Sequence, residues 1–274
     1  MKLQLYYPIK PFIKYQNFGD NDACSQISTL PLAKRKIVAK KDGICPVGYE
    51  ELYPLLGMKG HTGIDMFGGR GYPVYYCGPT GFVEEVQTEV ERGLGVGIIT
   101  NDKFEMEGGE YHAKTRYWHL MSYNVVKGQT VQTGDFIGLA NSTGLSSGDH
   151  LHFELKPNIK NSMGVWYNVF QDNGYYGSVN PEPYFNKLYA QQAKRFDKNL
   201  EYGQSGSEVL RLQSILKEMG FFTYPLCTGF YGSETAKAVL AFQWKYKIIN
   251  SWQYIFYGGR YFHEKTRNKL NNLL

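Results

Sequence analysis

The spacing of apolar residues changes near residue 185, and this change constrains the fold more than any other feature of the chain. Before it, short apolar or alternating runs are separated by glycines, as at 81–87 (GFVEEVQ), 95–100 (GVGIIT) and 135–140 (DFIGLA). Runs of this length bounded by turn residues predict β-strands. They do not alternate with helical segments, which argues against a parallel sheet. We therefore predict a mainly antiparallel β-domain over residues 1–185, including an extended N-terminal segment at 1–60.

From about residue 200 onward the apolar residues follow a helical period. Ser205 and Glu208 have capping-box spacing before the first helix, and Ser233 is a candidate N-cap for the second. Residues 186–199 are polar and lack glycine and proline, so they are interpreted as a connector. Residues 200–274 are predicted to form a small all-α domain of three helices. The three apolar stripes are Val209, Leu212, Ile215, Leu216 and Met219, then Thr235, Val239, Phe242 and Tyr246, then Thr266, Leu270 and Leu273.

The composition is typical of a soluble protein with two domains. The 274 residues are 42% hydrophobic and 20% charged, and no apolar run suits a signal peptide or a membrane-spanning helix. We expect synthesis in a cytoplasm, no membrane insertion and another exit route for any action outside. Residues 1–184 carry 17 Lys/Arg against 19 Asp/Glu, a net −2, whereas residues 185–274 carry 13 against 6, a net +7. Such a basic part attracts polyanions: nucleic acid, acidic membrane or anionic wall polymer.

The cysteines do not indicate a disulfide framework or a thiolate zinc site. Cys24, Cys45, Cys77 and Cys227 lack the close pairing that either arrangement requires. Cys24 and Cys45 could pair with each other within the N-terminal segment. We expect free thiols, because a cytoplasmic environment keeps them reduced.

Two histidines, His150 and His152, are separated by one residue in a predicted strand. Side chains two apart in a strand point to the same face. His150, His152 and Glu154 would therefore share one face, while Leu151 packs into the core from the other. The alternative is a pair of histidines that only faces solvent, and this spacing alone does not decide between the two.

Two further segments hold the remaining candidate residues. His61 and Asp65 would lie roughly 13 Å apart in an extended chain, so both reach one ion only if the chain bends, which Gly63 permits. Asp65 could otherwise be a turn residue, and His119 could be a buried core histidine. Four of the six histidines fall in these three segments, and histidine with carboxylate is the ligand set of a catalytic zinc with one open position.

These segments resemble the lysostaphin- and LytM-type zinc endopeptidases of bacterial cell walls. The family's His-x-x-x-Asp motif stands here as HTGID at 61–65, its central histidine as WHL at 118–120, and its closing His-x-His as HLH at 150–152. The similarity extends from about residue 18 to 183. It implies the family's duplicated hybrid-motif β-fold and one zinc per chain. The zinc would be bound by His61, Asp65 and His152, with His119 and His150 beside its open position.

The resemblance also implies a mechanism in which zinc lowers the pKa of its water to about 7 and polarises a peptide carbonyl. His119 and His150 would move protons or stabilise the oxyanion, and which of the two is the base stays open. Glu154 would act behind the ligands or lie on the surface. Because all five family positions are filled, an active enzyme is favoured over a non-catalytic regulator with the same fold.

Residues 200–274 resemble the small three-helix peptidoglycan-binding domain that accompanies many wall hydrolases. The matching residues include LEYGQSGSEV at 200–209, TGFYGSET at 228–235 and the pair at 242–243. Cys227 replaces an acidic residue that is frequent before this turn. The aromatic run at 252–256 lengthens the link to the third helix; Trp252 and Tyr254 would stack on glycan or stem peptide, or else pack against the helices.

The chain departs from the family in two long segments, at 20–60 and 158–178. We expect the second, with Trp166 and Tyr167, to border the substrate groove and shape substrate choice. The 23 tyrosines of the chain could fill a β-rich core or line a surface that stacks on sugars.

Together these patterns predict a monomeric zinc endopeptidase that cleaves stem or cross-bridge peptide bonds of peptidoglycan and lyses the wall to which its C-terminal domain anchors it. The setting expected is a phage endolysin or a virion-associated lysin. The alternative is a non-catalytic wall-binding or regulatory protein. A nucleic-acid partner is not expected, because a Lys/Arg-rich recognition helix and base-stacking motifs are missing from the sequence.

Overall fold

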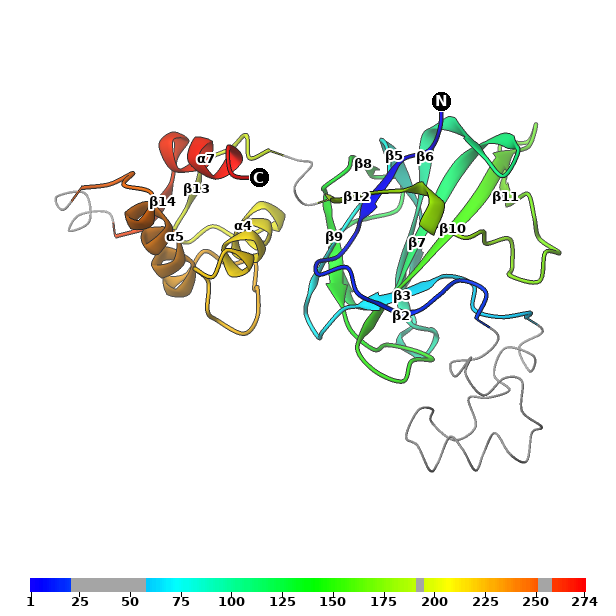
Figure 1. Cartoon of the computed structure of the whole chain (residues 1–274), viewed down its shortest axis with the longest axis horizontal. Helices are drawn as coiled ribbons and strands as arrows, with labels where there is room; N and C mark the ends of the chain where they lie inside the picture. The colour runs from blue at the N-terminus through cyan, green and yellow to red at the C-terminus, as the bar shows by residue number, and fades with distance from the viewer. Residues whose placement is uncertain (21–57, 191–194, 251–257) are drawn as a thin grey trace.

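The computed structural model describes residues 1–20, 58–190, 195–250 and 258–274, which form a β-domain and a helical domain (Figure 1). Every strand pair described in the ten-stranded sheet is antiparallel, which confirms the predicted fold class. Its strands are β2 (Lys14–Gln16), β3 (Ile64–Phe67), β4 (Pro73–Tyr75), β5 (Gly81–Gln87), β6 (Leu94–Met106), β7 (Gly109–Tyr123), β8 (Thr130–Val131), β9 (Phe136–Ala140), β10 (His150–Lys160) and β11 (Trp166–Asn168).

The long strands β10, β7 and β6 form the middle of the sheet, in the order β2-β3-β10-β7-β6-β5-β8. Alternate residues of β10 face the core, where Leu151, Phe153 and Leu155 are fully buried. Tyr117 of β7 packs edge-on against Phe153, with ring centroids 5.3 Å apart. The core thus fixes the apolar side of β10 and leaves its other side for a site. Short 3-10 turns lie elsewhere in the chain, at Val90–Arg92 (η3) and Glu182–Tyr184 (η4).

A two-stranded parallel ribbon joins the two ends of the β-domain. β1 (Leu5–Tyr7) pairs with β12 (Phe185–Tyr189), and the rings of Tyr7 and Phe185 lie 5.1 Å apart. The predicted connector at 186–199 therefore begins as a strand of the β-domain. The polar composition of 186–199 concealed this strand, whose two terminal aromatic residues, Phe185 and Tyr189, contact the ring of Tyr7.

Three helices in the described part of the C-terminal domain confirm the predicted small bundle: α4 (Ser207–Glu218), α5 (Ser233–Lys245) and α7 (Glu264–Asn271). Two strands, β13 (Leu200–Glu201) and β14 (Tyr261–Phe262), pair beside them. The apolar stripes of α4 and α5 are largely buried, as are Thr266 and Leu270, but Leu273 lies beyond α7 and is 43% exposed. Within the described residues, every helix is too short or too polar to cross a membrane.

The predicted helix caps are wrong. Gly206 and Gly232 occupy the N-cap positions of α4 and α5, and neither helix has a side-chain cap. Ser205 instead forms a β-bridge with Phe230, and Glu208 lies 3.4 Å from the guanidinium of Arg211. The backbone of Ser205 is thus paired with another segment, and the carboxylate of Glu208 faces Arg211, so the capping box does not form.

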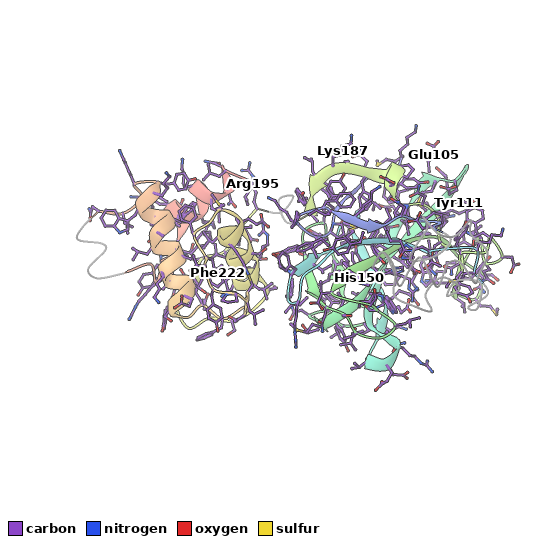
Figure 2. The ribbon with its side chains drawn as sticks, turned by 60° about the horizontal axis from the view of Figure 1, so that its bottom comes forward. Glu105, Tyr111, His150, Lys187, Arg195 and Phe222 are labelled. Carbon is purple, nitrogen blue, oxygen red and sulfur yellow. The ribbon has the colours of Figure 1, made fainter. Side chains whose placement is uncertain are left out.

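The helical domain packs on the β-domain through α4, which contacts β4 and β9. Tyr75 of β4 is fully buried, and Arg211 of α4, which is 1% exposed, lies close to it. Leu139 of β9 packs against the helical core, and Lys10 Nζ lies 3.0 Å from Glu218 Oε2. Figure 2 shows His150 within the β-domain and Phe222 among the helices.

Candidate metal centre

Three neighbouring strands carry the candidate site, with β10 between β3 and β7. His152 lies directly opposite Asp65 of β3 and Trp118 of β7. Residues directly opposite each other in a sheet point to the same face. His150 joins them through the two-residue alternation of β10, while Leu151 between the histidines is buried in the core. The structure thus brings the His-x-His pair and Asp65 to one face.

His119 reaches the same face through a local break in β7. In a regular strand it would point away from Trp118, to the opposite side of the sheet. Its φ is +64°, in the left-handed region, and the pairing register shifts near Leu120. The ring centroid of His119 consequently lies 4.7 Å from that of His150 and 5.8 Å from that of His152. His119 is part of the site and not a core histidine.

Gly63 allows the segment that carries His61 to approach β10 closely. A Cβ at this position would lie 2.3 Å from the carbonyl oxygen of Phe153, closer than real contacts allow. The backbone N–H of His61 donates to the carbonyl of Asp20 over 2.8 Å, which holds the segment from the other side. The predicted requirement for glycine therefore holds, although the reason is the contact with β10 as well as the bend.

The three predicted metal ligands converge on one point. His61 Nε2 lies 3.1 Å from Asp65 Oδ1, His152 Nδ1 lies 2.9 Å from the same oxygen, and the two nitrogens are 2.9 Å apart. Ligand atoms of a tetrahedral zinc at 2.0–2.1 Å from the ion are about 3.3 Å from each other. Two imidazoles and one carboxylate at these separations could hold a zinc ion after a small adjustment.

Backbone carbonyls fix the orientation of three of the four rings. An imidazole that donates from Nδ1 leaves Nε2 without a proton when neutral, so Nε2 is free to bind a metal or accept a proton. The Nδ1–oxygen distances are 3.0 Å for His61 to Asn17, 2.7 Å for His119 to Thr143 and 2.7 Å for His150 to Gly148.

The environment of the site shifts the pKa values of its groups in different directions. Burial lowers the pKa of His119 to about 4, and the neighbouring histidines contribute, so this ring is neutral near pH 7. Burial would raise the pKa of Asp65, but His61 and His152 bring it well below its usual range. Burial would lower the pKa of His152, but Asp65 and Glu154 raise it to about 9 in the metal-free protein. The metal-free site therefore holds an imidazolium against a carboxylate.

Glu154 is buried, at 5% exposure, and does not lie on the surface. Thr62 Oγ1 donates to its Oε1 over 2.6 Å, and Arg116 forms a short hydrogen bond to its Oε2. Burial would raise the pKa of Glu154, but Arg116 holds it well below the usual range. The face shared by His152 and Glu154 was visible in the sequence. Thr62 and Arg116 were not predicted, because Arg116 meets Glu154 only through the register of β7 and β10.

The predicted substrate residues are not brought to this centre. Trp166 lies opposite Lys160 at the far end of β10, eight residues from His152, which is about 26 Å along a strand. Its ring lies against His112, and Tyr167 follows it in β11. Trp252 and Tyr254 lie outside the described residues, as do Cys24 and Cys45. Cys77 and Cys227 are buried free thiols.

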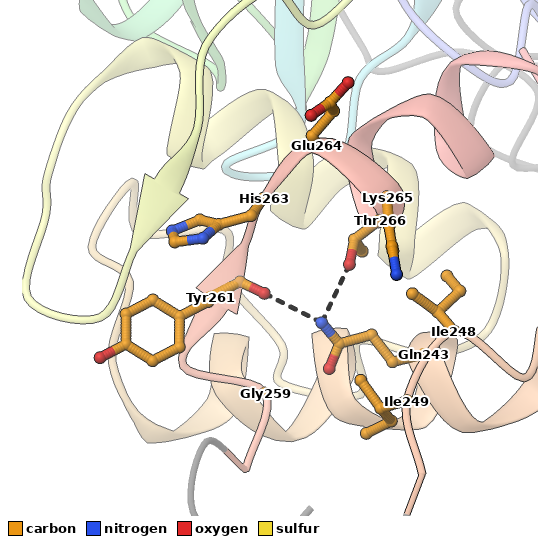
Figure 3. A pocket seen from close by; sticks show the side chains of 9 residues that line it. All are labelled: Gln243, Ile248, Ile249, Gly259, Tyr261, His263, Glu264, Lys265 and Thr266. Atoms are coloured by element: carbon orange, nitrogen blue, oxygen red, sulfur yellow. Dashed lines mark hydrogen bonds between the residues drawn. The ribbon is translucent and has the colours of Figure 1, made fainter. Parts of the chain in front are cut away.

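The helical domain has a cavity of about 420 Å³ between α5, β14 and α7 (Figure 3). Gln243 Nε2 donates to the carbonyl of Tyr261 over 2.9 Å and to Thr266 Oγ1 over 3.0 Å, which fixes one wall. Apolar Ile248 and basic Lys265 also line it. A cavity with apolar walls and a few polar groups suits a small part of a ligand.

Comparison with known protein families gives one match in each domain. Residues 59–163 match Peptidase family M23, and residues 205–249 match the family described as "Putative peptidoglycan binding domain". Lysostaphin from Staphylococcus simulans is 31% identical over 163 residues, covering 54% of this chain and 31% of that protein. Glycyl-glycine endopeptidase ALE-1 from Staphylococcus capitis is 35% identical over 108 residues, covering 39% of this chain and 27% of that protein.

Peptidoglycan DD-endopeptidase ShyB from Vibrio cholerae is 39% identical over 95 residues, covering 35% of this chain and 20% of that protein. The chain thus spans about a third or less of the length of these relatives. Among solved structures, the catalytic domain of lysostaphin from Staphylococcus simulans is 29% identical, with a TM-score of 0.35, covering 46% of this chain and 79% of that one.

Proposed function

We propose that this chain, in which a peptidase family M23 domain precedes a peptidoglycan-binding domain, is a zinc-dependent endopeptidase that cleaves peptide bonds of bacterial peptidoglycan. The observation that carries the proposal is the convergence of His61 Nε2, Asp65 Oδ1 and His152 Nδ1, with separations of 2.9–3.1 Å. These are ligand types that zinc takes, and the separations are close to the distance of about 3.3 Å between ligand atoms of a tetrahedral zinc. Zinc bound there would supply Lewis acidity, which activates water and polarises a carbonyl.

The residues beside the ligands would move protons. His119 is neutral near pH 7, and its Nδ1–H is held by the carbonyl of Thr143, so its Nε2 can accept a proton from an attacking water molecule. His150 has the same orientation, with Nε2 3.5 Å from Asp65 Oδ1. A protonated imidazole next to the reacting carbonyl can then donate to the leaving amine. Two such imidazoles on one side of the ligands suit hydrolysis of an amide.

The peptide bond that is cleaved belongs to the stem or cross-bridge peptides in this proposal. The names of the relatives support this substrate class, since ALE-1 is a glycyl-glycine endopeptidase and ShyB a peptidoglycan DD-endopeptidase. The net charge of +7 over residues 185–274 would favour an anionic wall. The cavity between α5 and α7 is the place where the wall-anchoring domain would accept part of its ligand.

The experiment that tests this function is cleavage of defined peptidoglycans. The full chain is loaded with zinc and mixed with purified sacculi of known cross-link chemistry, and the released fragments are identified by mass spectrometry. We expect new amino termini within the peptide moiety, which disappear with chelator and in His119→Ala. Zinc binding and sacculus sedimentation without cleavage would support a non-catalytic wall-binding protein instead. Absence of zinc binding would overturn the proposed centre.

A further inference from the structure

His152 is oriented differently from the other three histidines of the centre. His61, His119 and His150 each direct Nδ1 at a backbone carbonyl within 3.0 Å. His152 instead presents Nδ1 to Asp65 and His61, and its Nε2 faces the side chain of Glu154, with Oε1 at 3.4 Å. The tautomer of this ring in a metal-bound state therefore depends on a side-chain carboxylate and not on the backbone.

The carboxylate of Glu154 is itself held from several sides. Thr62 Oγ1 donates to Oε1 over 2.6 Å, and Arg116 Nη1 and Lys156 Nζ contact Oε2, the latter at 3.4 Å. Arg116 in turn lies 3.2 Å from Glu85 Oε1. Three partners around a buried carboxylate leave it little freedom to turn away from His152.

Sheet register produces this arrangement. Glu154 is two residues after His152 on β10, and Arg116 lies directly opposite Glu154, as Trp118 lies opposite His152. The guanidinium of Arg116 is also stacked on the ring of Trp118, 3.9 Å from its centroid. Thr62 follows the ligand His61 in the chain. The network thus joins the segments that supply two of the three predicted ligands.

We propose that Glu154 is a positioning residue of the metal centre: with Thr62 and Arg116, it holds His152 with a proton on Nε2 and Nδ1 facing the ion. A neutral imidazole carries one proton, so an acceptor at Nε2 determines which nitrogen is available to a metal. An anionic acceptor also makes the ligand nitrogen more basic. The inference rests on the proposed zinc site and adds the groups that orient one of its ligands.

The test measures zinc affinity by competition with a chromophoric chelator, which does not depend on activity. Glu154→Gln keeps the shape of the side chain. If Arg116 still binds the amide oxygen, the amide NH2 group points at the Nε2–H of His152, so two donors face each other. We expect the zinc dissociation constant to rise about 10- to 100-fold, as for other residues behind metal ligands. Proton–nitrogen correlation spectra of the zinc-loaded wild type should show the proton of His152 on Nε2. The cobalt-substituted variant should have an altered absorption spectrum.

Thr62 supplies a second, milder variant. Thr62→Val removes one hydrogen bond to Glu154 at nearly constant volume, and we expect roughly a three- to tenfold weaker affinity. Thr62→Ser keeps the hydroxyl and should restore wild-type affinity. The double variant with Glu154→Gln should be little weaker than Glu154→Gln alone, since Thr62 acts through Glu154.

The matched control is Glu85→Gln. Glu85 contacts the same Arg116 but none of the predicted metal ligands, so the zinc dissociation constant of this variant should lie within twofold of the wild-type value. Circular dichroism of each variant in chelator shows whether the fold persists; if Glu154→Gln does not fold, the Thr62 pair decides. This inference alone would be overturned if the wild type binds zinc and folded Glu154→Gln has the same zinc affinity and the same cobalt spectrum. Where only Thr62→Val folds, the same result in that variant would overturn it. If wild type does not bind zinc, the proposed function itself fails.

Discussion

Removal of zinc should make the stability of this protein fall as the pH rises from 6.5 to 9. In the metal-free protein the pKa of His152 is about 9, raised against burial by Asp65 and Glu154, while in the unfolded chain it is about 6.5. A raised folded-state pKa contributes stability below pH 6.5, and this is lost as pH rises towards 9. The difference of 2.5 units corresponds to about 3 kcal/mol.

In the proposed site the ion would replace the proton on His152 Nδ1, which removes this pH dependence. Between pH 6.5 and 9 neither the zinc-bound nor the unfolded imidazole carries the extra proton, so stability of the loaded protein should be almost constant. The amount by which zinc raises the free energy of unfolding should therefore grow by about 3 kcal/mol over this pH range. For a protein of this size that is a change of roughly 6–12 °C in Tm.

The assay is differential scanning calorimetry at pH 6.5, 7.5 and 9, with zinc and with chelator. Asp65→Asn is the control: it removes the carboxylate closest to His152, at 2.9 Å, and should flatten the curve of the metal-free protein. Parallel curves with and without zinc would refute the reasoning, since they would mean that the ion does not displace a proton from the site.

Three further outcomes are expected. His119→Ala should lower kcat on a cross-linked peptide about 10²- to 10⁴-fold while zinc affinity changes less than twofold, because the proposed role of His119 is proton transfer and not zinc binding; loss of zinc would contradict this role. Phe153→Ala removes a fully buried ring and should reduce the free energy of unfolding by about 3–5 kcal/mol in urea titrations, whereas a loss below 1 kcal/mol would show a loosely packed core. Replacing Trp166 and Tyr167 by alanine should change cleavage of cross-linked sacculi more than of short peptides, because both residues lie far along β10 from the centre; equal rates on both substrates would dismiss a substrate role.

Local periodicity predicted much of the site. The two-residue alternation of β10 places His150, His152 and Glu154 on one face without reference to any other strand. The helical stripes likewise located α4 and α5. These features could be predicted because they depend on residues close in sequence, or on the burial of an apolar face, which does not require a particular partner.

Features that depend on distant segments could not be predicted in this way. The burial of Glu154 requires Arg116, which only the register of β7 supplies. The left-handed φ of His119 is set by the break in β7 pairing and by the carbonyl of Thr143. The parallel pairing of β12 with β1 joins residues about 180 positions apart, and nothing in the polar segment itself indicates such a partner.

The contact of α4 with β4 and β9 limits how freely the two domains can be exchanged between proteins. Tyr75 is fully buried beside Arg211 of α4, so a different C-terminal domain grafted after Tyr189 would leave this aromatic surface uncovered. A successful chimera would have to retain α4 or replace Tyr75 with a polar residue. An exchange of the C-terminal domain would therefore need coordinated substitutions on both sides of this contact.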